Sequence, residues 1–291
     1  MTATLVLVAG KDPLDEPGGG HSSYVRAHAR AAMAAGWLPQ ILCVGATART
    51  METEFGVIHR VRSVARPYRQ LMIPAHGPVL ARALVDLAEQ EPGPLLAHGF
   101  GVWGVGAVRG VDRLRRSGRR ATAVISSYTT YRVETESLVR GAVGDPWRAR
   151  SSYRAQALWA GAVVERYERD AYRRATRVWV NYDAVRRIVV ARHGADVRLE
   201  RIGYGPESAF FPVPDPGPVP AEIRALESVE APLVVCVARH HSRKGVDVLI
   251  DALARLRDDG VPVRACLVGG GPLLAEHRRL VGALGLTGTV A

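Results

Sequence analysis

The chain has 291 residues, of which 47% are hydrophobic, 6% aromatic and 23% charged, a composition typical of a soluble globular protein longer than one average domain. Its formal net charge of +11 and isoelectric point near 10.2 would attract phosphates, anionic lipids or nucleic acid. Lys11 and Lys244 are the only lysines, however, and no nucleic-acid-binding motif accompanies the arginines, so we expect two domains with solvated arginine-rich faces and no nucleic-acid partner.

The first half of the chain alternates short apolar runs with longer segments of helical spacing. This order is typical of parallel βαβ units and predicts an open, doubly wound α/β sheet. The predicted strands are Leu5–Ala9, Ile41–Val44, Val57–Val61, Leu95–Ala97, Ala121–Ile125 and Arg177–Asn181, and the predicted helices are Ser23–Ala35, Pro78–Gln90 and one long or two shorter helices between Gly141 and Arg174.

The amino-terminal segment MTATLVLVAG lacks the basic region of a signal peptide and predicts a first strand. The stretch from Ala31 to Ala48 has no formal charge, but Gly36 and Pro39 interrupt it. It therefore predicts a helix end, a turn and a strand rather than a membrane span.

The three cysteines, Cys43, Cys236 and Cys266, are far apart in the sequence and flanked by apolar residues. They fit small buried side chains in a reducing compartment, and their spacing matches neither a zinc site nor a disulfide framework. We therefore expect a cytoplasmic protein.

A proline-rich segment divides the chain. Phe210–Pro220 excludes regular helix or central strand and predicts a stiff linker. Beyond it, strands at Leu233–Val237 and Val263–Val268 enclose a helix at Val246–Asp258, and the chain ends about two βα units into this second Rossmann-like domain. We expect a complete amino-terminal Rossmann-like domain at 1–208, a linker at 209–230 and an incomplete second domain at 231–291.

A glycine run, Gly18-Gly19-Gly20, lies between the first strand and the first helix, for which Ser22 or Ser23 is the predicted N-cap. Bare backbone N–H groups and a helix N-terminus would favour a phosphate there, and a flexible turn is the equally weighted alternative.

A dinucleotide-binding oxidoreductase fits this loop poorly. The loop contains no G-x-G-x-x-G, and the strand Ile41–Val44 ends in Gly45 and Ala46 with no acid to bind a ribose hydroxyl. A P-loop NTPase is excluded because the chain has no G-x-x-x-x-G-K-[ST] motif.

A second cluster places Arg239 and Lys244 in the loop that leaves the strand Leu233–Val237, with Gly245 near the start of the next helix. Two cations at the carboxyl end of a strand, facing a helix N-terminus, can neutralise a diphosphate leaving group. A surface role is the alternative for Arg239, and it is weaker for Lys244 because lysine is rare in this chain. A third motif, Gly269-Gly270-Gly271, would let a base or ribose approach the backbone closely.

Together, VARHHSRKGVDVLIDALARL and CLVGGGP closely resemble the donor-domain signature of family 4 retaining glycosyltransferases, which have the two-Rossmann-domain GT-B architecture. The segment Arg201–Pro212 resembles the element that joins the two halves of these enzymes. Gly18–Gly20 with the following HSSYV resembles their amino-terminal loop and helix. The resemblance covers the whole chain and is strongest over residues 233–291.

The resemblance implies transfer of a sugar from a nucleotide diphosphate-sugar, bound between the domains, to an acceptor with retained anomeric configuration and without a metal ion or other cofactor. Residues matching Arg239 and Lys244 would hold the diphosphate, and those matching Gly269–Gly271 would lie near the nucleoside. The loop matching Gly18–Gly20 would lie at the phosphate or acceptor edge. The sugar, the base and the acceptor, whether a sugar, a lipid-linked or a small molecule, stay open.

The chain departs from the family pattern in two places. Where the family ends a middle strand with a histidine that contacts the transferred sugar, Ala121–Ile125 runs into Ser126, Ser127 and Tyr128. His98, after the strand at Leu95, is the alternative contact, although a structural histidine is favoured there. We take His98, Ser127 and Tyr128 as candidate sugar or acceptor contacts.

The second departure is that the acidic Glu-x7-Glu pair, which grips the donor sugar and ribose in the family, is not found: residues 272–291 contain Glu276 alone. We therefore expect a truncated chain with little or no transferase activity.

Two other functions stay open. A nucleotide-sugar 2-epimerase shares the architecture but needs acid/base residues in the cleft, and product identity without acceptor would distinguish it. A non-catalytic scaffold half could bind a partner chain or the inner face of a membrane through the arginine-rich stretch Arg148–Arg201.

Overall fold

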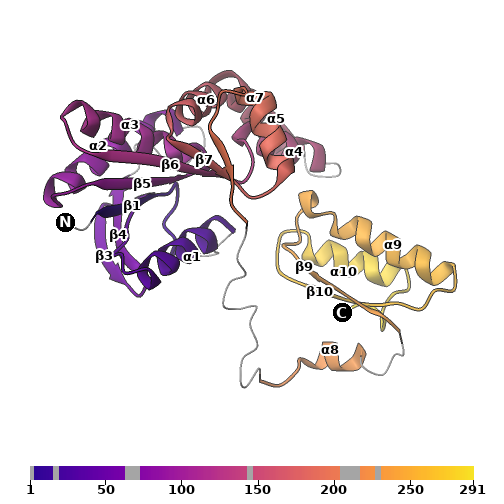
Figure 1. Ribbon diagram of the computed structural model, residues 1–291. Coiled ribbons are helices and arrows are strands. Elements are labelled where there is room, and N and C mark those ends of the chain that lie inside the picture. Colours follow the sequence, from indigo (N-terminus) through magenta and orange to yellow (C-terminus); the bar gives the residue numbers. More distant parts are fainter. Residues whose placement is uncertain (1–2, 16–19, 63–72, 143–146, 204–216, 227–230) are drawn as a thin grey trace. The chain divides into compact units, whose positions relative to one another are not determined.

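The computed structural model describes residues 3–15, 20–62, 73–142, 147–203, 217–226 and 231–291 (Figure 1). The chain divides into two compact units. Unit 1 comprises Met1–Glu136 and Arg154–Ser208, and unit 2 comprises Ser137–Tyr153 and Ala209–Ala291. Each unit is described by itself below.

Among the described residues, unit 1 contains an eight-stranded sheet in the order β3-β4-β2-β1-β5-β6-β7-β8. All neighbouring strands are parallel except β3, which pairs antiparallel with β4. The strands are β1 (Thr4–Val8), β2 (Gln40–Gly45), β3 (Arg49–Thr53), β4 (Gly56–Arg62), β5 (Leu95–Phe100), β6 (Ala121–Ser127), β7 (Arg177–Val180) and β8 (Leu199–Arg201).

The strand order reverses between β1 and β5. From β1 the chain proceeds outward to β2 and β4, then returns through α2 to place β5 on the other side of β1, where Leu7 pairs with His98. In an open parallel sheet, the crevice at the carboxyl ends of the strands at such a reversal is the usual ligand-binding position. The candidate residues at the ends of β5 and β6 are therefore placed where this fold binds ligands.

Helices cover both faces of this sheet, so its central strands are apolar throughout. Val6 and Val8 of β1 face a core formed with α2, α3 and α6, whereas Leu5 and Leu7 face a core formed with α1 (Figure 1). The helices from Gly20 to His193 are α1 (Gly20–Ala34), α2 (Ile73–Gln90), η1 (Gly101–Trp103), α3 (Gly104–Arg116), α4 (Tyr131–Gly141), α5 (Trp147–Trp159), the π-helical turn η2 (Ala160–Val164), α6 (Glu165–Arg174) and α7 (Asp183–His193).

Unit 2 contains a two-stranded parallel sheet of β9 (Leu233–Val237) and β10 (Arg264–Val268) within the described part of the chain. Ile250 and Leu253 pack with Ala265 and Leu286 to form its core. The helices of this unit's carboxyl-terminal part are α8 (Ala221–Leu226), η4 (Ser242–Lys244), α9 (Val246–Asp258) and α10 (Leu274–Ala283). Helix α8 lies within the stretch 209–230 that the sequence predicts as a linker.

The doubly wound α/β architecture, with a second Rossmann-like βα arrangement after it, is confirmed. The uncharged stretch Ala31–Ala48 contains the end of α1 and the whole of β2, as predicted. In the residues that the structure describes, no helix combines the length and the apolar character needed to cross a membrane.

Several predicted boundaries are wrong. Helix α1 begins at Gly20, so Ser22 is buried in its first turn and neither Ser22 nor Ser23 is the N-cap. Helix α2 begins at Ile73 rather than at Pro78, so Pro78 lies inside the helix. Pro74 occupies the first turn, where the missing N–H costs no hydrogen bond. Strand β5 extends to Phe100, so His98 lies inside it rather than after it. Cys236 is only partly buried, unlike Cys43 and Cys266.

The close packing of β5 against α3 predicts that the fold is sensitive to substitution of Gly99. A Cβ atom on Gly99 would overlap the backbone of Gly104, which cannot move aside like a flexible side chain. We expect Gly99→Ala to lower the free energy of unfolding by about 1–3 kcal/mol, measured by urea denaturation followed by circular dichroism. Gly20→Ala is the matched control, because its Cβ would meet no atom within 4 Å; equal effects of the two changes would contradict the packing argument.

Candidate functional site

The carboxyl edge of the sheet in unit 2 brings two predicted motifs together. Strands β9 and β10 are parallel, and Val237 pairs with Val268 at their ends. The loop with Arg239 and Lys244 follows β9, and the glycine turn Gly269–Gly271 follows β10, so both begin at the same edge.

The glycines of this turn are required by the approach of the neighbouring backbone. Gly269 and Gly271 have φ angles of 149° and 153°. A Cβ atom on Gly269 would overlap the carbonyl oxygen of Ala238, and one on Gly271 would overlap that of His240. The hydrogen bond from His240 N to Gly270 O, at 2.9 Å, continues the ladder beyond the strands. The glycine turn is therefore a structural requirement as well as a candidate ligand surface.

The amino terminus of α9 lies in the same loop. Gly245 adopts the left-handed conformation, with φ 64° and ψ 31°, and provides no side-chain cap. The N-cap residue therefore supplies no side-chain acceptor to the backbone N–H groups of the first turn of α9, and the helix dipole makes this position favourable for an anion. Asp247 is the acidic residue of this turn.

Arg239 and Lys244 have exposed side chains. Within the part of the chain that the structure describes, neither makes an ion pair or a side-chain hydrogen bond. Both cations therefore keep their full hydrogen-bonding capacity for a ligand such as a diphosphate.

Two buried histidines support this loop from behind, and the sequence prediction misses them. His240 lies between Arg239 and η4, and its Nδ1 atom is 2.8 Å from Nδ1 of His277 on α10. Each side chain is 3% exposed. No spacing rule connects residues that are 37 positions apart, so the sequence contains no signal for this pair.

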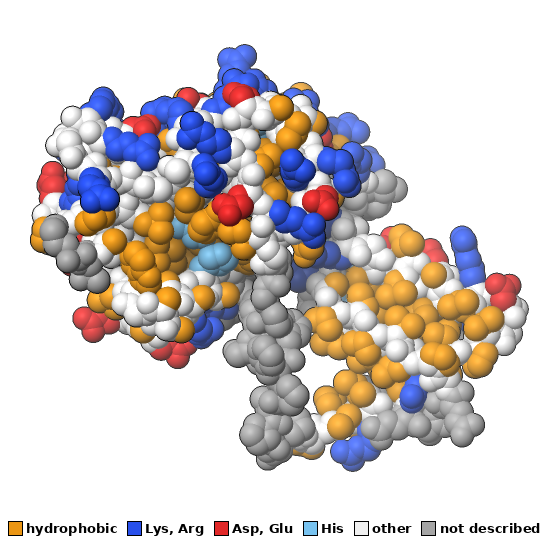
Figure 2. Space-filling view, in the orientation of Figure 1, with side chains coloured by type: hydrophobic (Ala, Val, Ile, Leu, Met, Phe, Trp, Pro, Cys, Tyr) orange, Lys and Arg blue, Asp and Glu red, His pale blue; other side chains and the backbone are white. Residues whose placement is uncertain are grey.

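In unit 1, imidazole and aromatic rings gather at the carboxyl ends of β5 and β6. The ring centroids of His28 and His98 are 5.0 Å apart, those of Tyr24 and Tyr128 are 4.2 Å apart, and Phe100 stacks on His98 at 4.4 Å. Figure 2 shows histidine side chains within a hydrophobic area of unit 1. His28 and Tyr24, both on α1, are site candidates that the sequence prediction misses.

The histidines of this cluster are held neutral. Burial and the neighbouring His28 lower the pKa of His98 well below its ordinary value. Burial also lowers the pKa of His28, although its hydrogen bond with Tyr24 O opposes this. Burial, together with the charge of Lys11, lowers the pKa of His21 from 6.5 to about 4. His98 Nε2 lies 2.8 Å from Ser126 Oγ, so a neutral ring is fixed beside the end of β6.

Ser127 takes part in a buried network rather than pointing to solvent. Its hydroxyl accepts a hydrogen bond from Tyr172 Oη at 3.0 Å and donates to Thr129 O at 3.3 Å. The single hydroxyl proton of Tyr172 is shared between Ser127 and Glu168 Oε1, which lies 3.3 Å away. Glu168 is also 3.1 Å from His193 and accepts from the Tyr131 backbone N–H. Through Tyr172, Glu168 therefore fixes the last residue of β6, and through the Tyr131 backbone it fixes the start of α4.

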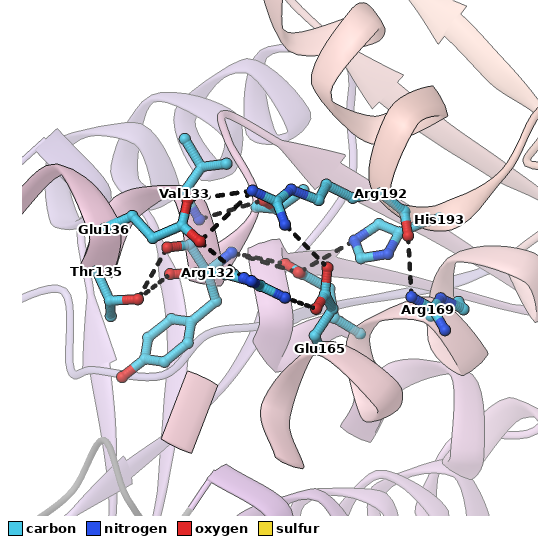
Figure 3. A network of polar contacts seen from close by, with 11 residues as sticks. Arg132, Val133, Thr135, Glu136, Glu165, Arg169, Arg192 and His193 are labelled. Atoms are coloured by element: carbon cyan, nitrogen blue, oxygen red, sulfur yellow. Dashed lines mark hydrogen bonds and ion pairs between the residues drawn. The ribbon is translucent and has the colours of Figure 1, made fainter. Parts of the chain in front are cut away.

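Arginine–glutamate pairs extend this network toward the surface of unit 1 (Figure 3). Arg132 bonds Glu136 at 2.8 Å and Glu165 at 2.9 Å, and Arg192 reaches Glu136 at 3.1 Å. These pairs join α4, α6 and α7. They belong to the scaffold, because each carboxylate already has cationic partners.

The remaining predicted residues lie in the amino-terminal loop. Gly18 and Gly19 lie outside the described residues, and Gly20 is the exposed first residue of α1. Nearby, the buried Asp12 carboxylate pairs with Arg60 and accepts the Leu14 backbone N–H at 2.8 Å. The loop after β1 is thereby attached to β4.

Comparison with known proteins supports a common fold. No protein-family model matches the chain. A GDP-mannose-dependent α-(1-6)-phosphatidylinositol monomannoside mannosyltransferase of Mycolicibacterium smegmatis is 36% identical over 96 residues, which is 32% of this chain and 24% of that protein. The match thus spans about a quarter of the curated relative.

Solved structures match over the whole chain. Sucrose-phosphate synthase from Thermosynechococcus elongatus superposes with a TM-score of 0.62 and 20% identity, covering 100% of this chain and 70% of that one. A glycosyltransferase from Rickettsia africae gives 0.55 and 14%, covering 100% and 68%. An α,α-trehalose-phosphate synthase from Burkholderia xenovorans gives 0.56 and 11%, covering 97% and 69%. The chain therefore has the GT-B fold of glycosyltransferases, and the resemblance to family 4 is confirmed at the level of the fold.

The lowered histidine pKa values predict acid sensitivity. A histidine whose pKa is lower in the folded than in the unfolded protein stabilises the fold fully above pH 6.5 and loses this contribution as the pH falls. For His21 the loss extends from pH 6.5 to about 4 and amounts to up to about 3 kcal/mol. We expect His21→Gln to reduce the fall in unfolding free energy between pH 7 and pH 4, measured by urea denaturation. An unchanged pH dependence of the variant would contradict this, and measurements at pH 8 provide the reference.

Proposed function

We propose that the chain is a glycosyltransferase that uses a nucleotide diphosphate-sugar as donor. The observation that carries this proposal is the edge of unit 2, where the unpaired Arg239 and Lys244 lie in the loop between β9 and the uncapped amino terminus of α9. The GT-B fold and the sequence similarity to a mannosyltransferase support it.

These groups suit the charge that develops during transfer. An acceptor hydroxyl oxygen forms a bond to the anomeric carbon while the bond from that carbon to the diphosphate breaks. The departing nucleoside diphosphate gains negative charge, which two cations and a helix dipole stabilise without a metal ion. The glycine turn Gly269–Gly271 would accept the nucleoside. We infer retained configuration from the family resemblance, and NMR of the product's anomeric proton tests it.

For the acceptor, we propose the ring cluster of unit 1, with Tyr128 as a direct contact and with His98, which is 4% exposed and bonded to Ser126, holding the cluster in place. The rings offer flat apolar faces beside hydrogen-bonding atoms, a combination that suits a sugar ring. Ser127 would act by holding the loop after β6, because its hydroxyl is already hydrogen-bonded. The similar mannosyltransferase is named for GDP-mannose and a phosphatidylinositol monomannoside, so GDP-mannose and a lipid-linked sugar are the first donor and acceptor to test.

A membrane-facing helix would suit a lipid-linked acceptor. In α5, Trp147 is 67% exposed and Leu158 is 75% exposed, and both lie on the same side of the helix as Arg154. Helix α5 also contains Arg148 and Arg150 but no acidic residue. We propose that this exposed face contacts the surface of an anionic membrane.

Donor binding provides the direct test. We expect titration calorimetry to detect binding of UDP-glucose or GDP-mannose, and Arg239→Ala and Lys244→Ala each to weaken it about 10- to 100-fold, the value of a charged hydrogen bond to phosphate. Arg255→Ala, an exposed arginine in the last turn of α9, is the matched control and should change nothing. Binding that is insensitive to both substitutions would place the donor elsewhere.

A product assay separates the alternative enzyme. An epimerase would convert the nucleotide-sugar in the absence of any acceptor, whereas a transferase releases the nucleoside diphosphate only as the sugar moves to an acceptor or to water. Failure to bind any nucleotide-sugar would favour the scaffold function.

Membrane contact is tested by vesicle sedimentation. Arg148, Arg150 and Arg154, all changed to Glu, should weaken binding to vesicles containing about 30% phosphatidylserine by 100-fold or more, at about 1 kcal/mol for each arginine. Arg186→Glu with Arg187→Glu, on exposed positions of α7, is the control. Equal loss in both variants would indicate a nonspecific charge effect and contradict a role for α5.

A further inference from the structure

The imidazole pair of His240 and His277 has a defined proton requirement. The Nδ1 atoms are 2.8 Å apart, and the ring centroids are 5.0 Å apart. At that distance one Nδ1 must donate a proton and the other must accept it with its lone pair. The contact therefore exists with both rings neutral or with one ring protonated, and a second proton would set two donors against each other.

The ring contact with His277 holds His240 in addition to two backbone hydrogen bonds. The backbone N–H of His240 donates to Gly270 O in the glycine turn at 2.9 Å. The carbonyl of His240 accepts from Leu273 N–H, just after that turn, at 3.1 Å. The ring contact with His277 adds a link to α10. Since Arg239 directly precedes His240, a shift of His240 would move this cation relative to the glycine turn.

We propose that His277 is a positioning residue for the donor: through His240 it holds the loop carrying Arg239 and Lys244 against the glycine turn, and a second proton on the pair releases the loop. This inference rests on the proposed function, because it assigns the loop to a nucleotide diphosphate-sugar.

The surroundings of the pair oppose a second proton. Burial lowers the pKa of His240 first, followed by the charge of His277, and Arg278 on α10 lowers it further, whereas a backbone hydrogen bond with Leu267 raises it. Arg278 thus acts on the ring from the element packed against it. Donor affinity should fall as the pH is lowered, because the second proton works against the contact between the two Nδ1 atoms.

The experiment measures donor affinity at two pH values. Titration calorimetry with GDP-mannose and UDP-glucose at pH 8.0 and pH 5.5 compares the wild-type chain with His277→Leu and with the double variant His240→Leu/His277→Leu. The diphosphate of a nucleotide-sugar is a diester with no proton that titrates in this range, so any change reports on the protein. His59→Gln, in unit 1, is the control for removal of a histidine.

We expect the wild-type affinity to fall severalfold between pH 8.0 and pH 5.5, less than the roughly tenfold change of an unshifted imidazole, because burial lowers the pKa of His240. His277→Leu leaves a buried imidazole nitrogen without a partner and should weaken binding about tenfold already at pH 8.0. The double variant removes both polar groups, so it should approach wild-type affinity at pH 8.0 and lose the pH dependence.

Two results would overturn the inference while leaving the proposed function intact: wild-type affinity of His277→Leu at pH 8.0, or a pH dependence that persists in the double variant. Absence of nucleotide-sugar binding by the wild-type chain would overturn both. Imidazole nitrogen NMR of the wild-type chain at pH 8.0 gives a check that needs no donor and no variant. Once the signals of His240 and His277 are assigned, one of these two rings should have a proton on Nδ1, and protonation of both rings only on Nε2 would exclude the pair.

Discussion

Parallel strand pairing is the constraint on which both halves of the candidate site depend. It brings the loops that follow β9 and β10 to one edge of unit 2, and those that follow β1, β5 and β6 to one edge of unit 1. In unit 2 the two loops approach so closely that only glycine fits at positions 269 and 271. The carbonyl of Ala238 occupies the space that a Cβ atom on Gly269 would need, and the carbonyl of His240 does the same for Gly271. The glycines that would admit a nucleoside are thus the ones that let two loops approach each other.

Each edge is supported by buried polar groups that bond to one another beneath the surface. In unit 1, Glu168 accepts hydrogen bonds from Tyr172 and the Tyr131 backbone and contacts His193. In unit 2, His240 and His277 satisfy each other. Such networks hold loops in one conformation because leaving any member unpaired is costly. The exposed residues at these edges, such as Arg239 and Lys244, are then available to a ligand because the fold does not depend on their side chains.

The sequence predicts the parts of this protein that follow short-range rules. Alternating apolar runs predict the sheet, and the strand–loop–helix pattern around Arg239, Lys244 and Gly245 predicts the loop between β9 and α9 that carries the two cations. Long-range and non-periodic features are missed: the edge strand β3 is exposed and polar, His240 meets His277 across 37 positions, and His98 lies within β5 because Gly99 and Phe100 continue the strand without a β-branched signal. The structure does not describe Gly18 and Gly19, so their assignment stays a prediction.

The distribution of ion pairs distinguishes the arginines that stabilise the fold from the cations that can bind a ligand. In unit 1, acidic residues pair repeatedly with arginines, as Asp12 does with Arg60 and Glu165 with Arg132. A carboxylate near a diphosphate site would repel the ligand and neutralise its cations. Arg239 and Lys244 have no carboxylate partner among the described residues, since Asp247 in the first turn of α9 pairs with neither. Lys244 lies immediately before Gly245, the N-cap of this helix. The net charge of +11 does not by itself locate a ligand site. Two cations without ion pairs among the described residues, beside a helix N-terminus without a side-chain cap, define a position where a diphosphate can form several favourable interactions.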